Sequence, residues 1–261
     1  MNADRNKTSC LRSLATSARR RLARRLIYNG GLPRMQPANQ IAFYDLDGTL
    51  ISSNVVTQYA FFVRKHPSRV TAALKYAKLL LSVPALIAID AYSRKTFNHV
   101  FFREYRGMKR DWLLGMAGEL FETVMRPAIF PGAKALVEAD RARGMRTVLV
   151  TGSPDFALGP IVSYFGFDDV ICNRLVYRDG AATGKVAEPL IAEKEKVAAM
   201  LNLSRAHDAE PSQSRAYSDS FSDVAMLEAV GHPSAVNPDR RLKRIALDRG
   251  WPVLDLKNGN H

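Results

Sequence analysis

"IAFYDLDGTLISSN" (residues 41–54) joins a short run of apolar residues to two aspartates that are separated by a single residue. An apolar run of this length is typical of a buried strand in a parallel sheet. Asp45 and Asp47 follow the run at once, and two ionised carboxylates so close together repel each other. A carboxylate at the end of a buried strand destabilises a fold unless it is paired or binds a cation. The stretch therefore predicts a polar site at the end of a strand.

The composition is that of a globular protein with a basic extension. The chain has 261 residues and a formal net charge of +13, with 47% hydrophobic and 24% charged residues. Residues 1–36 contain nine Lys and Arg against one acid, so much of the basicity lies there. Cys10 and Cys172 are far apart in sequence, so we expect no disulfide framework and a reducing compartment.

The basic extension contains "LRSLATSARRRLARRLI" (residues 11–27), in which apolar residues recur at helical spacing. This pattern is typical of an amphipathic helix that lies on anionic lipid, and a disordered basic tail is the alternative. The extension lacks the apolar core of a secretory signal. We therefore expect a cytoplasmic protein, either free or peripheral at the inner face of the membrane. The run "LLLSVPALIAI" (residues 79–89) contains Pro84 and is too short to span a bilayer, so no transmembrane span is expected.

Predicted strands alternate with predicted helices along much of the chain. The predicted strands are 41–46, 147–150, 169–173, 215–218, 233–237 and 252–256, with helices at 153–167, 223–230 and 238–250 and another from about residue 193. A hairpin is expected over residues 174–186, with its turn at Asp179 and Gly180. Residues 55–128 read as helical throughout.

This alternation predicts an α/β fold with a Rossmann-like parallel sheet. We expect residues 37–54 and 129–261 to form the core and residues 55–128 to form an inserted helical cap. The cap would lie over the carboxyl ends of the strands, where open α/β sheets bind their ligands.

Four segments fall at the ends of predicted strands or the starts of predicted helices: "DLDGTL" (45–50), "VTGSP" (150–154), "EKEKVAAM" (193–200) and "SDSFSD" (218–223). The fold would bring them to one crevice. Asp219 and Asp223 then add two carboxylates to Asp45 and Asp47, and a divalent cation would offset their repulsion. Oxygen-only ligands favour Mg²⁺.

Two further segments suit a phosphate. Thr151 and Gly152 precede a predicted helix, where a hydroxyl and free backbone N–H groups can bind a phosphate oxygen, although an ordinary helix cap is the alternative. Lys194 and Lys196 flank Glu195 at the start of another helix. A lysine there would reduce the repulsion between a carboxylate nucleophile and a phosphate.

The order of these segments resembles the haloacid dehalogenase superfamily of phosphohydrolases with an aspartate nucleophile, and in particular its phosphoserine-phosphatase-like branch (subfamily IB). "DLDGT" matches the first motif, DxDGT, and Thr151 matches the second. Lys196 best matches the third, with Lys194 as the alternative. Asp219 and Asp223 match the acidic pair of the fourth. The resemblance covers about residues 40–256.

The resemblance implies a Mg²⁺-dependent phosphatase that acts through an aspartyl-phosphate. Asp45 would be the nucleophile, and Asp47 the general acid and base. Mg²⁺ would bind a carboxylate oxygen of Asp45, the backbone carbonyl of Asp47, and Asp219, while Asp223 would support the metal's water shell. The phosphoryl oxygens would contact Thr151, the Gly152 N–H and Lys196.

The substrate is less well defined by the sequence. Phosphoserine phosphatases carry a Glu nine residues after the nucleophile and Ser-Gly-Gly at the second motif, whereas this chain has Asn54 and "TGSPDF". Residues 55–110 combine eleven Lys and Arg with many aromatic residues, which suits solvated helix faces, a membrane-facing surface or, least of the three, nucleic acid. We expect a lipid-linked or membrane-proximal phosphate monoester. The alternatives are phosphoserine or another small metabolite, or a non-catalytic lipid- or nucleic-acid-binding module on the same fold.

Overall fold

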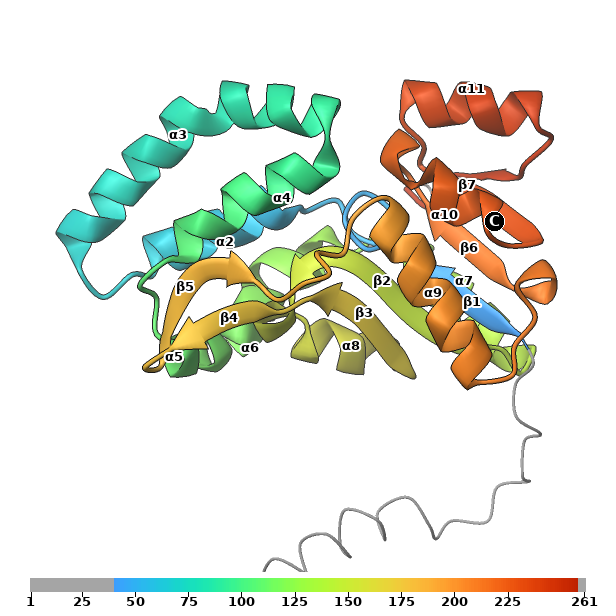
Figure 1. Cartoon of the computed structure of the whole chain (residues 1–261), viewed down its shortest axis with the longest axis horizontal. Coiled ribbons are helices and arrows are strands. Elements are labelled where there is room, and N and C mark those ends of the chain that lie inside the picture. Colours follow the sequence, from blue (N-terminus) through green and yellow to red (C-terminus); the bar gives the residue numbers. More distant parts are fainter. Residues whose placement is uncertain (1–39, 258–261) are drawn as a thin grey trace, which may run out of the picture. The chain divides into compact units, whose positions relative to one another are not determined.

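The stretch "IAFYDLDGTLISSN" begins as a central strand of a parallel sheet and leaves the sheet after Tyr44. A computed structural model describes residues 40–257, and in it Ile41–Tyr44 is strand β1, with all four side chains buried. The six-stranded sheet has the order β3-β2-β1-β6-β7-β8 (Figure 1). Its other strands are β2 (Arg146–Pro154), β3 (Asp169–Asn173), β6 (Arg215–Ser218), β7 (His232–Val236) and β8 (Val253–Leu254). The predicted α/β fold with a Rossmann-like parallel sheet is confirmed.

The register of the sheet places the motif segments at one edge. Tyr44 of β1 lies opposite Leu149 of β2 and opposite Tyr217 of β6, and all three strands run parallel. The residues that follow these three positions therefore leave the sheet on the same side. This is the carboxyl edge, where parallel sheets bind their ligands.

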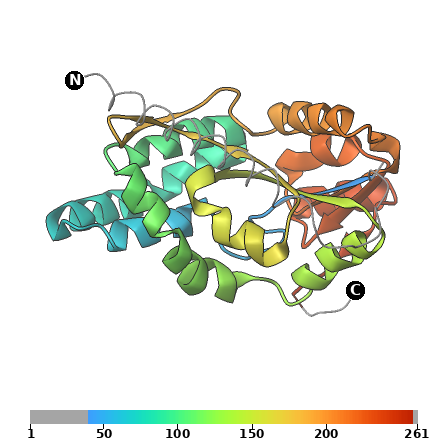
Figure 2. The same cartoon turned by 90° about the horizontal axis from the view of Figure 1, so that it is seen from below.

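Helices cover both faces of the sheet (Figure 2). They are α7 (Ala133–Ala142), α8 (Gly159–Phe165), α9 (Lys194–Ala206), α10 (Val224–Glu228) and α11 (Arg240–Asp248), with short helical turns at Asp155–Ala157, Pro211–Gln213 and Phe221–Asp223. Alternate residues of β1 belong to different apolar clusters, because successive side chains of a strand point to opposite faces. Tyr44 packs with residues of α7 and α8, whereas Phe43 packs with residues of α9, α10 and α11.

Between β1 and α7 the chain forms an insert of helices. They are α2 (Val55–Arg64), α3 (Arg69–Tyr92), α4 (Arg94–Phe102), the 3₁₀ turn η1 (Arg103–Tyr105), α5 (Arg110–Gly115), α6 (Ala117–Leu120), the π-helical turn η2 (Phe121–Met125) and the 3₁₀ turn η3 (Arg126–Ala128). Residues 55–128 thus contain helical elements, as expected. The boundary between a cap and a core remains a prediction.

The predicted hairpin is present and packs on the helical insert. Strands β4 (Leu175–Arg178) and β5 (Ala181–Val186) pair antiparallel, and the turn residues Asp179 and Gly180 both have positive φ, as a type I′ turn requires. Backbone hydrogen bonds of 2.8 Å join Gly107 N–H to the carbonyl of Ala182, and Ala182 N–H to the carbonyl of Met108. The hairpin therefore extends from the sheet to the insert.

Strand β2 is longer than the sequence predicts, and helix α3 continues through a proline. Strand β2 continues to Pro154 and helix α8 begins only at Gly159, so the helix predicted from residue 153 is wrong at its start. Helix α3 has 24 residues and continues through Pro84, with a bend that Figure 1 shows. By length and composition it is the one helix within residues 40–257 that could cross a membrane, although one such helix is weak evidence of a span. The shortness of residues 79–89 was the reason to expect no transmembrane span, and the 24-residue length of α3 removes that reason.

The predicted basic extension, with its amphipathic helix over residues 11–27, lies outside the described residues. So does Cys10. Cys172 is described as a free, partly buried thiol in β3, and burial raises its pKa to about 11.

Candidate active site

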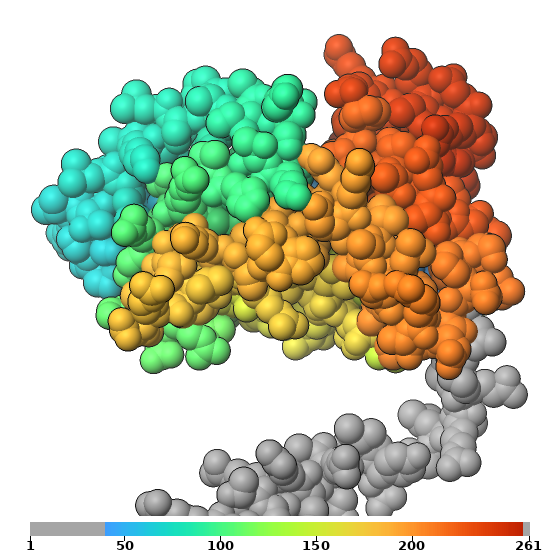
Figure 3. Space-filling view, viewed as in Figure 1, coloured from blue at the N-terminus to red at the C-terminus, as the bar shows by residue number. Residues whose placement is uncertain are grey.

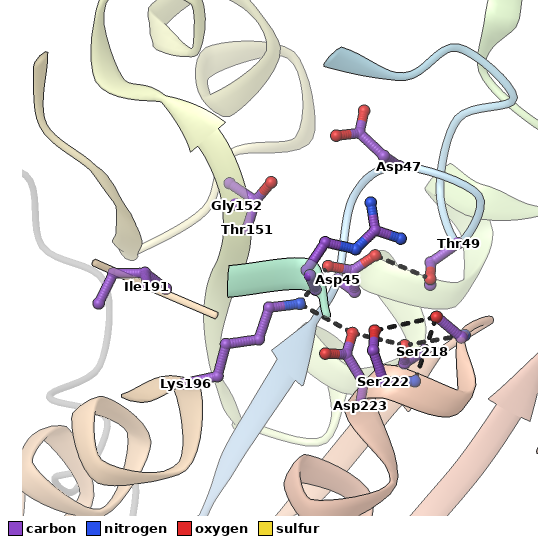
Figure 4. Close-up of polar contacts among 12 residues, drawn as sticks. Asp45, Asp47, Thr49, Thr151, Gly152, Ile191, Lys196, Ser218, Ser222 and Asp223 are labelled. Carbon is purple, nitrogen blue, oxygen red and sulfur yellow. Dashed lines mark hydrogen bonds and ion pairs between the residues drawn. The ribbon is translucent and has the colours of Figure 1, made fainter. Parts of the chain in front are cut away.

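Asp45 forms a buried ion-pair cluster with two other residues of the predicted site. Lys196, on the first turn of α9, places its Nζ 2.7 Å from Asp45 Oδ1 and 2.8 Å from Asp223 Oδ2 (Figure 4). All three side chains are buried. Ser218 donates a further hydrogen bond of 2.8 Å to Asp223 Oδ2. The structure thus joins residues that are 151 positions apart in sequence, and it places Lys196 rather than the exposed Lys194 beside Asp45.

The electrostatics of this cluster keep the lysine charged. Burial alone would lower the pKa of Lys196, but the charges of Asp223 and Asp45 raise it above its ordinary value. Burial raises the pKa of Asp45, and the Lys196 ammonium acts against that rise. An ammonium between two carboxylates offsets most of their mutual repulsion.

Asp47 points away from Asp45 (Figure 4). Its carboxylate accepts hydrogen bonds from Gln58 Nε2 at 3.0 Å and from Ser153 Oγ at 2.8 Å. Burial, followed by the charge of Asp45, raises the pKa of Asp47 to about 7. A carboxyl with that pKa can exchange a proton near neutral pH, which suits a general acid and base.

Asp219 is joined to Asp45 through the hydroxyl of Thr49. Thr49 Oγ1 lies 3.0 Å from Asp219 Oδ1 and 3.3 Å from Asp45 Oδ2. Burial and the charge of Asp45 raise the pKa of Asp219 to about 8. Gly48 lies against this carboxylate, because a Cβ on Gly48 would be 2.1 Å from Asp219 Oδ2. The residue also has a φ of +91°, which favours glycine.

The four predicted carboxylates do not form a single cluster. Among residues 40–257 no group of three or more His, Cys, Asp and Glu side chains is placed to hold a metal ion. Asp47 is turned toward Gln58 and Ser153, and Asp223 toward Lys196 and Ser218. Asp45 and Asp219 lie on either side of Thr49, and burial together with the charge of Asp45 raises the pKa of Asp219, although Lys196 pairs with Asp45. Two carboxylates with a backbone carbonyl and water suit Mg²⁺, so the donor set fits this ion.

Thr151 and Gly152 lie within β2 and not at the start of a helix. The predicted reason for their phosphate binding is therefore wrong, because β2 continues past them. Thr151 is buried, and its Oγ1 accepts the backbone N–H of Ser153 at 3.0 Å. The Gly152 carbonyl accepts a hydrogen bond of 2.8 Å from Asn173 Nδ2, which fixes the backbone at this position.

A small cavity of about 40 Å³ brings most of the predicted residues together. Asp45, Asp47, Gly152, Lys196 and Asp223 line it, whereas Thr151 and Asp219 do not. The helical insert closes the cavity with Val55, Arg94 and Asn98. Asn98 is buried, and its Nδ2 has no hydrogen-bond partner among the described residues. A donor in this state is suited to an acceptor on a bound ligand.

A second cavity of about 290 Å³ lies next to the first and shares Asp47 with it. Gly48 and Asp219 of the core line it, and the insert contributes both polar and apolar residues: Asp90 and Arg94, with Val55, Val56, Val83, Leu86, Ile87 and Phe97. Asn54 also borders this cavity. Its side chain caps α2 by accepting the backbone N–H groups of Val56 and Thr57, at 3.0 and 3.1 Å. The residue at the position of the phosphoserine-phosphatase Glu thus has a structural role.

Several residues of the site escaped the sequence analysis. They are Thr49, Gln58, Arg94, Asn98, Ser153 and Ser218. Gln58 and Asn98 are single amides within apolar or aromatic stretches, "VVTQYAFFV" and "TFNHVFF", which is a weak signal of a buried polar role. Ser153 lies two residues after Thr151, and only a longer strand would have placed both on one face.

Comparison with known proteins agrees with this geometry. Residues 42–228 match the family model of haloacid dehalogenase-like hydrolases. The chain is 33% identical over 231 residues to a protein of Mycobacterium tuberculosis named a probable phosphatase, a match that covers 87% of this chain and 78% of the relative. It is 26% identical over 224 residues to a phosphoserine phosphatase of the same species, covering 83% and 70%. A crystal structure from Bordetella pertussis, described as a protein with unknown function, superposes with a TM-score of 0.73 at 27% identity and covers 84% of this chain and 99% of that one. The chain is therefore a phosphatase and belongs to the haloacid dehalogenase-like hydrolase family.

Proposed function

We propose that this phosphatase hydrolyses a phosphate monoester by way of a covalent phosphate on Asp45. The observation that carries the proposal is the position of Lys196, whose Nζ lies 2.7 Å from Asp45 and 2.8 Å from Asp223. An ammonium there favours the ionised, nucleophilic form of Asp45 against the effect of burial, and it lowers the repulsion that an incoming phosphate would meet. All four motif positions carry the residues that the reaction needs, which does not favour a non-catalytic binding module.

Asp45 and Asp47 would divide the chemistry into two steps. In the first, a carboxylate oxygen of Asp45 forms a bond to phosphorus while the bond to the alcohol oxygen breaks, and Asp47 gives its proton to that oxygen. In the second, Asp47 takes a proton from water, the water oxygen bonds to phosphorus, and the bond to Asp45 breaks. The pKa of about 7 for Asp47 supports both proton transfers.

Mg²⁺ belongs to the proposal because the donors present fit it. Asp45, Asp219 and the backbone carbonyl of Asp47 would hold the ion. When bound, it would neutralise part of the negative charge of the phosphoryl group. Asp223 would act through Lys196, since its carboxylate bonds to that ammonium.

The phosphoryl oxygens would contact Lys196 and the backbone N–H of Gly152, with Thr151 close by. Gly152 supports this assignment because it lines the same cavity as Asp45 and Lys196. The unpartnered Nδ2 of Asn98 is a further donor from the insert. Thr151 would act by fixing the turn of backbone at Ser153, whose hydroxyl bonds to Asp47.

The alcohol part of the ester would be apolar and lipid-linked. The cavity of about 290 Å³ that adjoins Asp47 is lined on the insert side by aliphatic and aromatic residues, which suit an acyl or alkyl group. A small polar metabolite such as phosphoserine is the second candidate. It is favoured by Asp90, which borders the same cavity and pairs with Arg94 at 3.1 Å, because this pair could bind an amino acid's charged groups.

The test is an Asp45→Asn variant of the full chain, assayed with Mg²⁺ and an aryl phosphate. We expect turnover to fall by at least about 10³-fold, because a neutral amide is a poor nucleophile. Acid quenching of a reaction with ³²P-labelled substrate should leave label on the wild-type chain and none on the variant. Asp248→Asn, an exposed aspartate on α11, is the control and should keep full activity.

Activity that survives in Asp45→Asn would overturn the proposed reaction. The alcohol group is tested separately, with a panel of lipid and soluble monoesters that includes phosphoserine. Turnover of a soluble metabolite far above that of every lipid ester would overturn the lipid-linked assignment while leaving the reaction intact.

A further inference from the structure

Helix α3 presents an apolar face to solvent. Large side chains on this face are strongly exposed, namely Val70, Leu74, Leu80, Leu81, Ile87 and Tyr92. They lie on the solvent-facing side of the helix together with the exposed small residues Ala77, Pro84 and Ala88, and we name these six large side chains the apolar stripe. Surface helices normally have the reverse arrangement, with polar residues outward. Contiguous exposed apolar surface of this kind marks an interaction site.

The other side of α3 packs against the rest of the insert. Leu79 and Leu86 are buried, and Lys75 Nζ donates 2.9 Å to the carbonyl of Glu104 in η1. Lys78 pairs with the carboxylate of Glu104. The helix lies along the outer edge of the insert (Figure 3) and offers 24 residues to a partner on that edge, with the bend near Pro84 between its two halves.

The charge around the apolar stripe selects an anionic partner. Residues 64–95 contain seven Lys and Arg and one acid, Asp90. Four of these cations pair with acidic side chains. Arg64 and Arg69, at the start of the stripe, have no acidic partner within residues 40–257. Apolar side chains flanked by cations match the interface of an anionic bilayer, whereas a second copy would bring like charge to like charge.

We propose that α3 docks this protein on anionic lipid, with the apolar stripe in the interface and the helix parallel to the membrane plane. A spanning orientation is disfavoured, because Leu79, Leu86 and Lys75 would have to leave their partners in the insert. Ile87 belongs to the stripe and also lines the cavity beside Asp47. Val83 and Leu86, on the inner side of the same helix, line that cavity as well. Docking therefore brings the mouth of that cavity to the bilayer surface. This docking proposal is separate from the proposed reaction and does not depend on it.

The test is vesicle flotation with the full chain. Wild type is compared with a Leu74→Gln, Leu81→Gln variant, in which two stripe residues that lie outside the cavity become polar at little change in helix propensity. Leu201→Gln, Leu247→Gln is the matched control, since both residues are exposed apolar side chains on other helices. The probes are vesicles of phosphatidylcholine with and without phosphatidylglycerol.

Wild type and the control should float with the anionic vesicles, and the stripe variant should bind at least about tenfold more weakly. Turnover of a soluble aryl phosphate should be equal in all three proteins, which shows that the variant is folded. Flotation does not depend on turnover. If the proposed reaction through Asp45 were wrong, flotation would be unaffected, so the two proposals can fail independently. Absence of wild-type flotation would overturn the proposal, and so would equal flotation of wild type and stripe variant when both are compared without residues 1–36, since that basic extension is itself expected to bind anionic lipid. So would a dimer in solution that the stripe variant abolishes, because the stripe would then cover a second copy.

Discussion

Thr49 joins three groups of the site through a single hydroxyl. Its hydroxyl lies between the carboxylates of Asp45 and Asp219, and it also accepts the backbone N–H of Asp219 at 3.0 Å. Because one oxygen contacts both carboxylates, their separation is fixed by a residue only four positions after the nucleophile. The DLDGT motif therefore encodes a spacing between two strands as well as a reactive group.

Gly48→Ala is predicted to disturb this spacing. Its Cβ would lie 2.1 Å from Asp219 Oδ2, so the carboxylate must move. We expect a large loss of Mg²⁺-dependent turnover, at least about tenfold, and a smaller rise in melting temperature on adding Mg²⁺. Gly250→Ala is the control, since Gly250 also has positive φ but has nothing within 4 Å of the added methyl. Both variants should lose about 1 kcal/mol from backbone strain. Normal turnover in Gly48→Ala would contradict the assignment of Asp219.

At the scale of single residues, the sequence predicts those site residues that belong to a recognisable motif. Lys196 was preferred to Lys194 from its place in the motif, and its burial beside Asp45 agrees with that choice. Gln58 and Ser153 could not be assigned, because their contact with Asp47 depends on how the insert packs over the sheet. The orientation of Asp47 away from Asp45 was unpredictable for the same reason.

The start of helix α2 gives Asn54, a residue close to the site, a structural role as its N-cap. Asn54 and Thr57 form a reciprocal capping box, in which the Thr57 hydroxyl accepts the N–H of Asn54 at 3.0 Å. The first helix of the insert is thereby fixed ten residues after β1. A Glu at this position would lose the short-chain geometry that an N-cap needs.

Asn54→Ala is predicted to lower the free energy of unfolding by about 1 kcal/mol, because two backbone N–H groups of α2 lose their acceptor. Asn54→Asp should stay close to wild type, since aspartate caps equally well and its charge suits a helix N-terminus. Urea unfolding of the three proteins measures the difference. If the alanine variant were as stable as wild type, the cap would have no energetic role.

At the scale of elements, boundaries were the weakest part of the prediction. The strand "TVLV" was expected to end at Val150, but β2 continues through "TGSP" and carries Thr151 and Ser153 at the site. The apolar run around Pro84 predicts only a short segment, but α3 continues through Pro84 with a bend and has 24 residues. In both cases tertiary packing overrides the local signal of Pro or Gly.

In the whole molecule, a buried carboxylate holds the sheet to one of its covering helices. Asp140 of α7 is fully buried, and its Oδ2 accepts hydrogen bonds of 2.7 Å from the hydroxyls of Tyr44 and Tyr217. Arg143 pairs with its other oxygen at 2.7 Å. The two tyrosine rings stack, with centroids 4.9 Å apart. Strands β1 and β6, which carry Asp45 and Asp219 at their ends, are thus anchored together beneath the site.

This cluster predicts a loss of stability at high pH. Burial, the charge of Asp140 and its hydrogen bond raise the pKa of Tyr217 above the ordinary value of about 10. The folded state then keeps a proton that the unfolded state releases, so the contribution of Tyr217 is present below about pH 10 and is lost as the pH rises further. The free energy of unfolding should therefore fall above about pH 10.

Tyr217→Phe should make that fall shallower and should cost about 1–3 kcal/mol near neutral pH, because Asp140 loses a buried donor. Denaturant unfolding across the alkaline range measures both effects. Tyr92→Phe is the control, since Tyr92 is 89% exposed, and it should leave the pH dependence of wild type unchanged. Identical alkaline slopes for wild type and Tyr217→Phe would contradict this account.

The architecture of the whole molecule was well predicted because its signals are long and repeated. Alternation of apolar strands with helices sets a parallel sheet, and the ends of parallel strands must then meet at one edge. The role of the hairpin was not foreseen. Its assignment to the core stays a prediction, and β5 also bonds to Gly107 and Met108 of the insert, a contact between distant segments that no local pattern encodes.

The carboxyl group of Asp47 is held from two sides that belong to different parts of the chain. Ser153 lies on the sheet, and Gln58 lies on the first helix of the insert. Any movement of that helix away from the sheet would break one of the two hydrogen bonds and admit water to the carboxyl. The surroundings of the acid would then differ between an open and a closed molecule, and its readiness to give up a proton would follow the presence of a ligand beneath the insert.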